Sequence, residues 1–302
     1  MRSWRPSPSP YRKDKPMTEM HSSEDLYLFF PQWEGSGKTE VYIGATILQQ
    51  ILQPHIPFNA IKVEAAHEPD FEHDILGYSH ILRYAQEAHH LLSSKNPRRI
   101  FTLGGDCGIE VAPISFLNKR YDGDLAVIWL DAHADSNTPL SSPSKTFHGM
   151  VLRTLLGEGA PELVATSFSR LLPQQIFLAG VRDLDVPEQR FLSHAQVSSF
   201  TSAQLTTQAE EIADTLKKQG FSHVYLHIDV DVLDPLSFPA VKDISHFPTP
   251  GGIDIQTLRH FQHIMISKLT TVGWCLTEVI PPQHENMHEL EQLAGLYAQA
   301  LK

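Results

Sequence analysis

Residues 125–135 read LAVIWLDAHAD, an apolar run that passes directly into acids and a histidine. A short, continuous apolar run is typical of a β-strand that is covered on both faces. Residues 224–235 read VYLHIDVDVLDP and repeat this arrangement, and the run Ile100–Leu103 is followed by Gly104-Gly105-Asp106-Cys107. Because ligands of an open parallel sheet bind outside the carboxyl ends of its strands, these polar residues are the first candidates for chemistry.

Apolar, strand-like runs alternate with helical patterns from Asp25 onward. The predicted strands are Leu26–Phe30, Ala60–Glu64, Ile100–Leu103, Leu125–Leu130, Ile176–Gly180, Val224–Ile228 and Val272–Leu276. The predicted helices are Val41–Leu52, Leu76–Ser93, Ala203–Lys218, Ile255–Ser267 and Glu285–Leu301. Such alternation indicates a parallel sheet between layers of helices. We therefore expect an α/β fold over residues 24–302, a single-domain three-layer sandwich with a central, mostly parallel sheet.

Composition excludes several classes of protein. The chain has 302 residues, of which 41% are hydrophobic and 20% charged, as is ordinary for one large globular domain. Its formal net charge of -11 argues against a nucleic-acid partner, and no apolar run is long enough to span a membrane. The two cysteines, Cys107 and Cys275, fit a reducing compartment, so we expect a cytoplasmic protein. Residues 1–23 are rich in Pro, Ser and basic residues and predict a disordered tail, which leaves Met17 as an alternative start.

Four carboxylates and a histidine follow two of the predicted strands. Alternate residues of a strand point to the same side, so Asp131, His133 and Asp135 would point together if the strand conformation continued. The same holds for Asp229 and Asp231. Converging carboxylates repel one another unless a cation lies between them, and two divalent metals resolve the repulsion better than one. A lone Asp after a strand is often only a helix cap, but capping does not explain a histidine among acids.

The motifs DAHAD (131–135) and DVDVLDP (229–235) resemble those of the ureohydrolase family, which comprises arginases, agmatinases, formiminoglutamases and related guanidino-acid hydrolases. Their order and separation also fit, and the pattern is most similar to that of arginases. The resemblance implies an arginase-like fold, two divalent metal ions per chain, usually manganese, and a homo-oligomer, either a trimer or a hexamer. The ligands that it implies, with Asp131 and Asp229 bridging the ions, are Asp131, His133, Asp135, Asp229 and Asp231.

Other stretches resemble the substrate-binding segments of arginases. Asn137-Thr138-Pro139, Ser144 and His148-Gly149 follow the second metal motif. The resemblance implies that Asn137 and Ser144 hold the α-carboxylate of the substrate and that His148 acts as an acid, a base or a proton shuttle. Hydroxyl and amide donors suit a carboxylate, which an agmatine substrate would lack.

The remaining roles concern the two cationic groups of a guanidino amino acid. By the same resemblance Asp185, in Arg182-Asp183-Leu184-Asp185, would read the α-amino group, and Glu278 would pair with the guanidinium. A planar guanidinium is best held by a carboxylate in fork geometry. The leaving amine needs a proton, which Asp231 or His148 would deliver.

Two departures from the family pattern stand out. Cys107 stands where family members usually have His, and if it ligates as a thiolate the site would favour zinc, cobalt, iron or nickel over manganese. If Cys107 is instead a small packing residue, one metal site is weakened and the protein would be mononuclear or inactive. The stretch Leu236–Pro250 is longer than the corresponding arginase loop, which leaves the length of the substrate open.

The leading prediction is an amidinohydrolase that uses a metal-bridging hydroxide to convert L-arginine and water to L-ornithine and urea. Formiminoglutamate, agmatine or another guanidino acid are alternative substrates. A different class of function is a catalytically impaired relative that serves as a structural or regulatory subunit. A deacetylase of related fold is a weaker fit, since that site needs one zinc and fewer acids.

Overall fold

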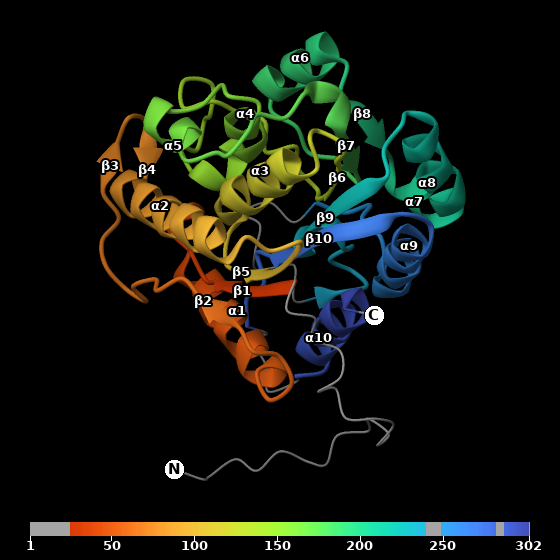
Figure 1. Ribbon diagram of the computed structural model, residues 1–302, viewed down its shortest axis with the longest axis horizontal. Coiled ribbons are helices and arrows are strands. Elements are labelled where there is room, and N and C mark those ends of the chain that lie inside the picture. Colours follow the sequence, from red (N-terminus) through yellow and green to blue (C-terminus); the bar gives the residue numbers. More distant parts are fainter. Residues whose placement is uncertain (1–24, 240–248, 282–286, 302) are drawn as a thin grey trace.

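The computed structural model describes residues 25–239, 249–281 and 287–301 of the chain. The predicted tail at 1–23 and the alternative start at Met17 lie outside these residues. So do residues 240–248, the middle of the Leu236–Pro250 stretch. Figure 1 shows a central sheet with helices on both sides.

The sheet is parallel at every strand pair among the described residues, which goes beyond the mostly parallel sheet that was expected. It has eight strands in this part of the chain. In spatial order they are β2 (Asn59–Ala60), β1 (Asp25–Phe30), β5 (Arg99–Gly104), β10 (Thr270–Thr277), β9 (His223–Asp229), β6 (Ala126–Leu130), β7 (Ile176–Ala179) and β8 (Ser198–Phe200). All carboxyl ends therefore lie along one edge, with β5, β10, β9 and β6 as neighbours at its centre.

Side chains alternate between the two faces of the sheet and build two separate cores. On β6, Ala126, Ile128 and Leu130 belong to one core, and Val127 and Trp129 belong to the other. This alternation is the geometry of a strand, and burial on both faces explains why the run is apolar without interruption.

Two sets of helices cover these faces (Figure 1). One face packs against α1 (Thr39–Leu52), α7 (Ser202–Thr207), α8 (Ala209–Lys218), α9 (Ile255–Lys268) and α10 (His288–Ala300). The other packs against α2 (Tyr78–Lys95), α3 (Val111–Arg120), α4 (Val151–Leu155) and α5 (Pro161–Ala165). The arrangement confirms the expected single-domain three-layer α/β sandwich. None of the described helices has the length and apolar character needed to cross a membrane.

The predicted strand Ala60–Glu64 is wrong beyond its first residue, because only Asn59–Ala60 pairs with β1. Side chains satisfy the backbone that follows in place of a neighbouring strand. The indole of Trp33 donates to the carbonyl of Glu64 at 2.8 Å, and the amide of Glu64 donates to the hydroxyl of Tyr84 at 3.1 Å.

The predicted helix Ala203–Lys218 is two helices, α7 and α8, with a break at Gln208. Thr206 and Thr207 donate their hydroxyls to carbonyls one turn earlier, and β-branched residues with such bonds favour helix interiors weakly. The predicted helix Leu76–Ser93 starts two residues later, at Tyr78, because Gly77 adopts a left-handed φ of 73°.

Several elements were not predicted. They are α3, α4, α5, α6 (Val186–Ala195), β8 and the hairpin of β3 (Phe71–Glu72) and β4 (Ile75–Leu76). Most of them are short. The start of the predicted helix Glu285–Leu301 lies outside the described residues, and its described part is α10.

Candidate metal and substrate site

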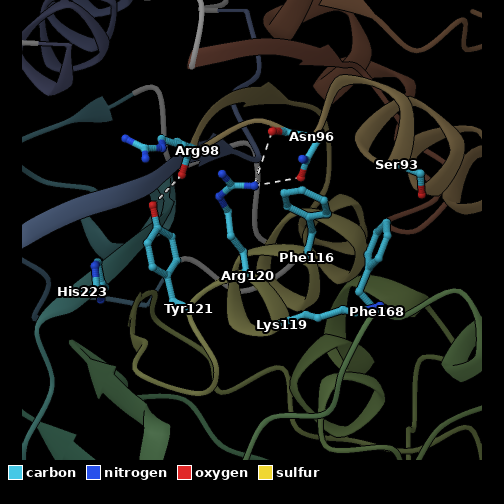
Figure 2. Close-up of a pocket in the computed structure, with 9 residues that line it drawn as sticks. All are labelled: Ser93, Asn96, Arg98, Phe116, Lys119, Arg120, Tyr121, Phe168 and His223. Carbon is cyan, nitrogen blue, oxygen red and sulfur yellow. Dashed lines mark hydrogen bonds between the residues drawn. The ribbon is translucent and has the colours of Figure 1, made fainter.

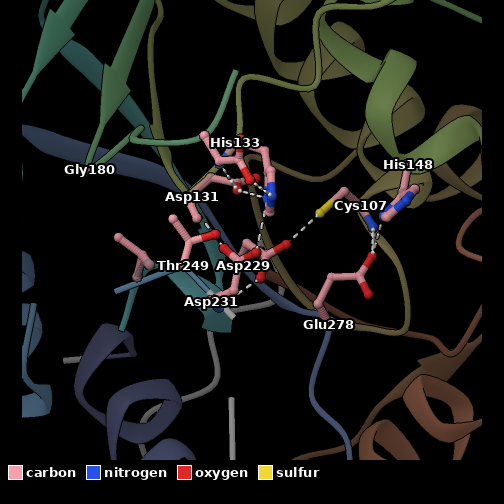
Figure 3. Close-up of polar contacts among 12 residues, drawn as sticks. Cys107, Asp131, His133, His148, Gly180, Asp229, Asp231, Thr249 and Glu278 are labelled. Carbon is pink, nitrogen blue, oxygen red and sulfur yellow. Dashed lines mark hydrogen bonds and ion pairs between the residues drawn. The ribbon is translucent and has the colours of Figure 1, made fainter. Parts of the chain in front are cut away.

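The four central strands bring predicted metal-ligand residues and the predicted guanidinium partner Glu278 to one place. Cys107 follows β5, Asp131 follows β6, Asp229 ends β9, and Glu278 follows β10. All four are buried, with exposed fractions of 4% or less. Figure 3 shows these side chains pointing toward one another from the ends of neighbouring strands.

The side chains do not converge by a continued strand, so that part of the prediction is wrong. β6 ends at Leu130, and Asp135 adopts a left-handed φ of 47°, which Asp tolerates better than most residues. Asp231 lies in a 3₁₀ turn, η5 (Val230–Val232), whose first amides are capped by Asp229: the amide of Asp231 donates to Asp229 Oδ1 at 2.8 Å. Tight turns at the strand ends therefore aim these acids inward.

Three overlapping groups of ligand-type side chains form there. Within each group the potential ligand atoms lie within 4.8 Å of one another. The groups are Cys107 with Asp131, Asp135 and His227; Asp131 with His133 and Asp231; and Cys107 with Asp229 and Glu278. Asp131 belongs to two of the groups and Cys107 to two, so the groups share one continuous buried cluster.

The side chains of this cluster include more acids than the basic groups beside them can neutralise. Burial, and then the charges of neighbouring carboxylates, raise the pKa of Asp131, Asp135 and Asp229. The buried Oδ2 of Asp135 has no hydrogen-bond partner among the described residues. Buried carboxylates with an orphaned oxygen are costly unless a cation is present, so the donor set fits divalent metals.

His133 and Asp231 form an ion pair within the cluster, with His133 Nδ1 3.0 Å from Asp231 Oδ2. Burial lowers the pKa of His133, but the charge of Asp231 and hydrogen bonds to both acids raise it by more. Burial raises the pKa of Asp231, but His133 lowers it by more, and the net shift is downward. The imidazole thus offsets part of the negative charge of the acids around it.

Asp106 holds the loop that carries Cys107. Its carboxylate accepts bonds from the amides of Gly35 at 2.9 Å and Gly108 at 2.8 Å and from the Gln32 side chain at 3.0 Å. A Cβ on Gly35 would lie 2.4 Å from Asp106 Oδ1, so this approach requires glycine. Burial, and then the charge of Glu278, raise the pKa of Asp106 to about 8.

His148 and Glu278, the predicted proton donor and the predicted guanidinium partner, lie in contact. His148 Nδ1 lies 3.1 Å from Glu278 Oε1, and the amide of Cys107 donates to the same oxygen at 3.3 Å. Burial lowers the pKa of His148, but the hydrogen bond with Glu278 raises it by more. An imidazole with a raised pKa is therefore held next to an acid and beside the cluster.

Of the residues predicted to bind the amino-acid end of the substrate, Asn137 and Asp185 contact each other, and Ser144 has other partners. Asn137 Nδ2 donates to Asp185 Oδ2 at 3.0 Å, so these two meet across 48 residues of sequence. Ser144 is exposed, and its hydroxyl pairs with the hydroxyls of Thr146 and Ser142. Asp185 is also the residue before α6, and its side chain contacts Asn137.

Glu188 belongs to the stretch that resembles the amine-reading segment of arginases, was given no role of its own, and supports this segment. Its carboxylate accepts from the amide of Ser136 at 2.8 Å and from the amide of Asp185 at 3.1 Å. The signal was the acid three residues after Asp185, the spacing of a capping box. Glu188 thereby ties the segment after Asp135 to the start of α6.

Two buried residues beneath the cluster were also missed. His227, in the middle of the apolar run 224–228, and Glu110, between apolar residues of the 3₁₀ turn η2 (Cys107–Glu110), are both fully buried. A single polar residue inside a buried run was the available signal.

A cavity in the part of the chain that the structure describes lies away from this cluster. It measures about 930 Å³ and sits at the amino ends of the strands, where Arg98 precedes β5 and His223 begins β9 (Figure 2). Basic and aromatic side chains line it, among them Lys119, Arg120 and Tyr121. No carboxylate lines this cavity, so it offers neither metal ligands nor a partner for a guanidinium.

Comparison with known proteins gives a consistent result. A sequence model of the arginase family matches residues 41–300. The arginase of Staphylococcus aureus strain MRSA252 is 32% identical over 246 residues, which cover 78% of this chain and 80% of that protein.

Solved structures share the fold. The arginase of Entamoeba histolytica, in complex with L-ornithine, gives a TM-score of 0.80 at 22% identity and covers 92% of this chain and 98% of that chain. The formimidoylglutamase of Bacillus subtilis strain 168 gives 0.71 at 18% identity, with 98% and 93% covered. With most of its length matched by the family and its strand ends carrying the family's acidic motifs, this chain belongs to the arginase family and is a hydrolase of guanidino C–N bonds.

Proposed function

We propose that this protein hydrolyses L-arginine to L-ornithine and urea at a site that holds two divalent metal ions. The position of Glu278 carries the proposal: its carboxylate lies beside the buried cluster and forms a group with Cys107 and Asp229. A guanidinium held by Glu278 would lie against the metal-ligand side chains. The arginase relatives, and the L-ornithine bound to the Entamoeba histolytica enzyme, support the same reaction.

The metal ligands divide into two sets that share acids. Cys107, Asp131 and Asp135 would hold one ion, and Asp131, His133 and Asp231 would hold the other. By the resemblance, Asp229 would contribute to both. Divalent ions bound there supply Lewis acidity and activate water for attack at a guanidinium carbon at neutral pH. Manganese is expected from the family, and zinc, cobalt, iron or nickel also fit because a cysteine sulfur is a softer ligand than imidazole.

Glu278 acts on the guanidinium carbon, and His148 acts on the amine that leaves it. Glu278 accepts hydrogen bonds from the guanidinium and orients its carbon toward the cluster. His148, whose pKa the hydrogen bond with Glu278 raises, donates a proton to the leaving amine. Asp231, which the resemblance also suggests, is the alternative proton carrier, and its Oδ2 lies 3.0 Å from His133 Nδ1.

Asp185, Asn137 and Ser144 recognise the amino-acid end. Asp185 pairs with the α-amino group, and Asn137 holds the Asp185 carboxylate through the 3.0 Å bond from its Nδ2. Asn137 and the exposed Ser144 supply the amide and hydroxyl donors for the α-carboxylate. This end distinguishes arginine from agmatine, which has no α-carboxylate.

A combined metal and substrate assay tests the proposal. Metal content is measured by mass spectrometry, and product release is followed after loading with manganese, zinc, cobalt, iron or nickel. Urea is measured from arginine, agmatine and 4-guanidinobutyrate, and formamide from formiminoglutamate. Two metals per chain with selective urea release from arginine is the expected result.

Two other outcomes contradict the proposal. Equal turnover of arginine and agmatine would remove the role of an α-carboxylate site. Metal binding without urea from any guanidino substrate would exclude the arginase reaction, and formamide release would then identify a formiminoglutamase.

A further inference from the structure

His227 is a buried imidazole whose surroundings prepare one nitrogen for a ligand. It lies on β9, two residues before Asp229, and both it and Glu110 are fully buried. The rings of Trp129 and His227 stack with centroids 3.5 Å apart and planes 18° apart, which fixes the plane of the imidazole. A buried, oriented imidazole among apolar strands needs a reason beyond packing.

Glu110 determines which imidazole nitrogen carries the proton. His227 Nδ1 lies 2.8 Å from Glu110 Oε1, and the hydroxyl of Tyr225 donates to Glu110 Oε2 at 2.6 Å. A carboxylate held in this way accepts, so Nδ1 donates and Nε2 keeps its lone pair. That lone pair faces the cluster, since Nε2 lies 3.6 Å from Cys107 Sγ.

We propose that His227 is a metal ligand through Nε2 and that Glu110, held by Tyr225, orients it. The proposal rests on the proposed two-metal function and adds a donor to the ion that Cys107 and Asp135 bind. The grouping supports it, because ligand atoms of His227, Cys107, Asp131 and Asp135 all lie within 4.8 Å of one another. A ligating imidazole commonly donates its other N–H to a carboxylate, which fixes the ring and raises its basicity.

This assignment changes the chemistry of the pair of metal sites. The ion at Cys107 gains a sulfur and an imidazole nitrogen, whereas the ion at His133 has one imidazole and oxygen ligands. Sulfur and imidazole favour zinc, cobalt or iron over manganese. His227 also restores an imidazole to the ion whose usual histidine is replaced by Cys107.

Cys107, His227 and Glu110 are also connected in the order of a Cys–His–Glu catalytic triad, in which Cys107 would be the attacking thiolate. The surroundings of the sulfur favour ligation instead. Cys107 is fully buried, and its Sγ lies 3.3 Å from Asp229 Oδ2, whereas reactive thiolates are stabilised by positive charge and are partly exposed. A metal ion supplies the positive charge that a thiolate needs at this place.

X-ray absorption of the zinc-loaded protein tests the ligand set directly. The wild type is expected to show a sulfur scatterer at about 2.3 Å and imidazole scattering from two histidines per two zinc ions. In His227→Gln the imidazole signal falls to one per chain and the sulfur signal remains. In Cys107→Ser the sulfur signal is lost and both imidazoles remain. His223→Gln, also on β9 but at its opposite end, is the matched control and leaves the spectrum unchanged.

Chelator competition gives a second readout that does not depend on activity. Glu110→Gln is expected to weaken binding of one of the two ions by about 10–100-fold, as is typical when the carboxylate partner of a ligating histidine is removed. His227→Gln weakens the same ion by more, and His223→Gln has no effect. Circular dichroism confirms that each variant is folded, and His227→Asn replaces the glutamine variant if that one is not.

Three results would overturn the inference, and each contradicts a different part of it. A wild type that binds no divalent metal contradicts the proposed function as well. Two tightly bound ions and two imidazole signals in His227→Gln contradict only the role of His227. Arginine hydrolysis that survives chelation and is abolished by Cys107→Ser would make Cys107 the nucleophile.

Discussion

The guanidinium of Arg182 donates through Nη2 to the main-chain carbonyl of Asp231 at 2.6 Å. The same guanidinium donates through Nε to the carbonyl of Thr249 at 3.0 Å and through Nη1 to the carbonyl of Gly180 at 3.1 Å. One side chain thus connects the turn after β9 to two other segments, and Figure 3 shows Gly180, Asp231 and Thr249 together. The resemblance had suggested only a substrate role for this segment, whereas the contacts of Arg182 are structural.

Arg182→Lys is expected to lower the free energy of unfolding by about 2 kcal/mol, because an ammonium cannot replace the guanidinium fork. Urea denaturation measures the change. The exposed Arg190 of α6 provides the control, Arg190→Lys, which should fall within about 0.5 kcal/mol of the wild type. An unchanged Arg182→Lys variant would mean that the three carbonyls are satisfied without the guanidinium.

Glu278→Gln is expected to lower kcat/KM for arginine roughly 30-fold, which corresponds to about 2 kcal/mol. The amide keeps the size of the side chain but loses the charge that pairs with a guanidinium. Steady-state kinetics measures the loss, with the exposed Glu291→Gln of α10 as the control. Wild-type kinetics in Glu278→Gln would be incompatible with the guanidinium role.

Asp185→Asn distinguishes the two ends of the substrate. The variant should lose roughly 30-fold in kcat/KM with arginine and with agmatine, which both carry an amine, because the charge that pairs with the amine is lost. It should retain its rate with 4-guanidinobutyrate, which has no amine. A uniform loss on all three substrates would show that Asp185 supports the fold of the site, through Asn137 and α6, and does not read the amine.

Removal of the proposed metals should destabilise the protein. An ion at 100 times its Kd contributes about 2.7 kcal/mol to the folded state, so chelation is expected to lower Tm by roughly 5–10 °C. Asp135→Asn should raise the Tm of the chelated protein, because burial and neighbouring carboxylates disfavour ionisation of the Asp135 carboxyl, whose Oδ2 is unpartnered. Scanning calorimetry measures both effects, and a Tm insensitive to chelation would argue against metals in the cluster.

Alkaline stability should depend on Tyr78. Its hydroxyl donates to Glu162 Oε2 at 2.8 Å, and burial, followed by this bond, raises the pKa of Tyr78 from 10.0 to about 12. The folded state thus keeps a proton that the unfolded chain loses, so this contribution is complete below pH 10 and is lost as the pH rises toward 12.

Tyr78→Phe should therefore lose less stability than the wild type between about pH 9 and about pH 11. Urea midpoints at the two pH values give the comparison, and Tyr42→Phe serves as the control. Equal losses in wild type and Tyr78→Phe would contradict the raised pKa.

Much of the sheet and part of the site could be predicted because their signals are local in sequence. Leu125–Leu130 is apolar throughout because both faces of β6 are covered, and the acids after it are polar because the strand has ended. The segment Ala60–Glu64 was mispredicted as a strand. Its backbone at Glu64 is hydrogen-bonded by the side chains of Trp33 and Tyr84 in place of a neighbouring strand, and these residues are remote in sequence.

The sequence by itself determined the α/β class, the polar residues at the carboxyl ends of the strands and the family motifs, because each depends on residues a few positions apart. Only the tertiary structure decided which of these side chains meet. The order β5-β10-β9-β6 brings Glu278 to the amide of Cys107 across 171 residues and places His227 against Glu110 across 117. In the sequence His227 is one letter inside an apolar strand; its neighbours are set by how parallel strands pair, which no local pattern encodes.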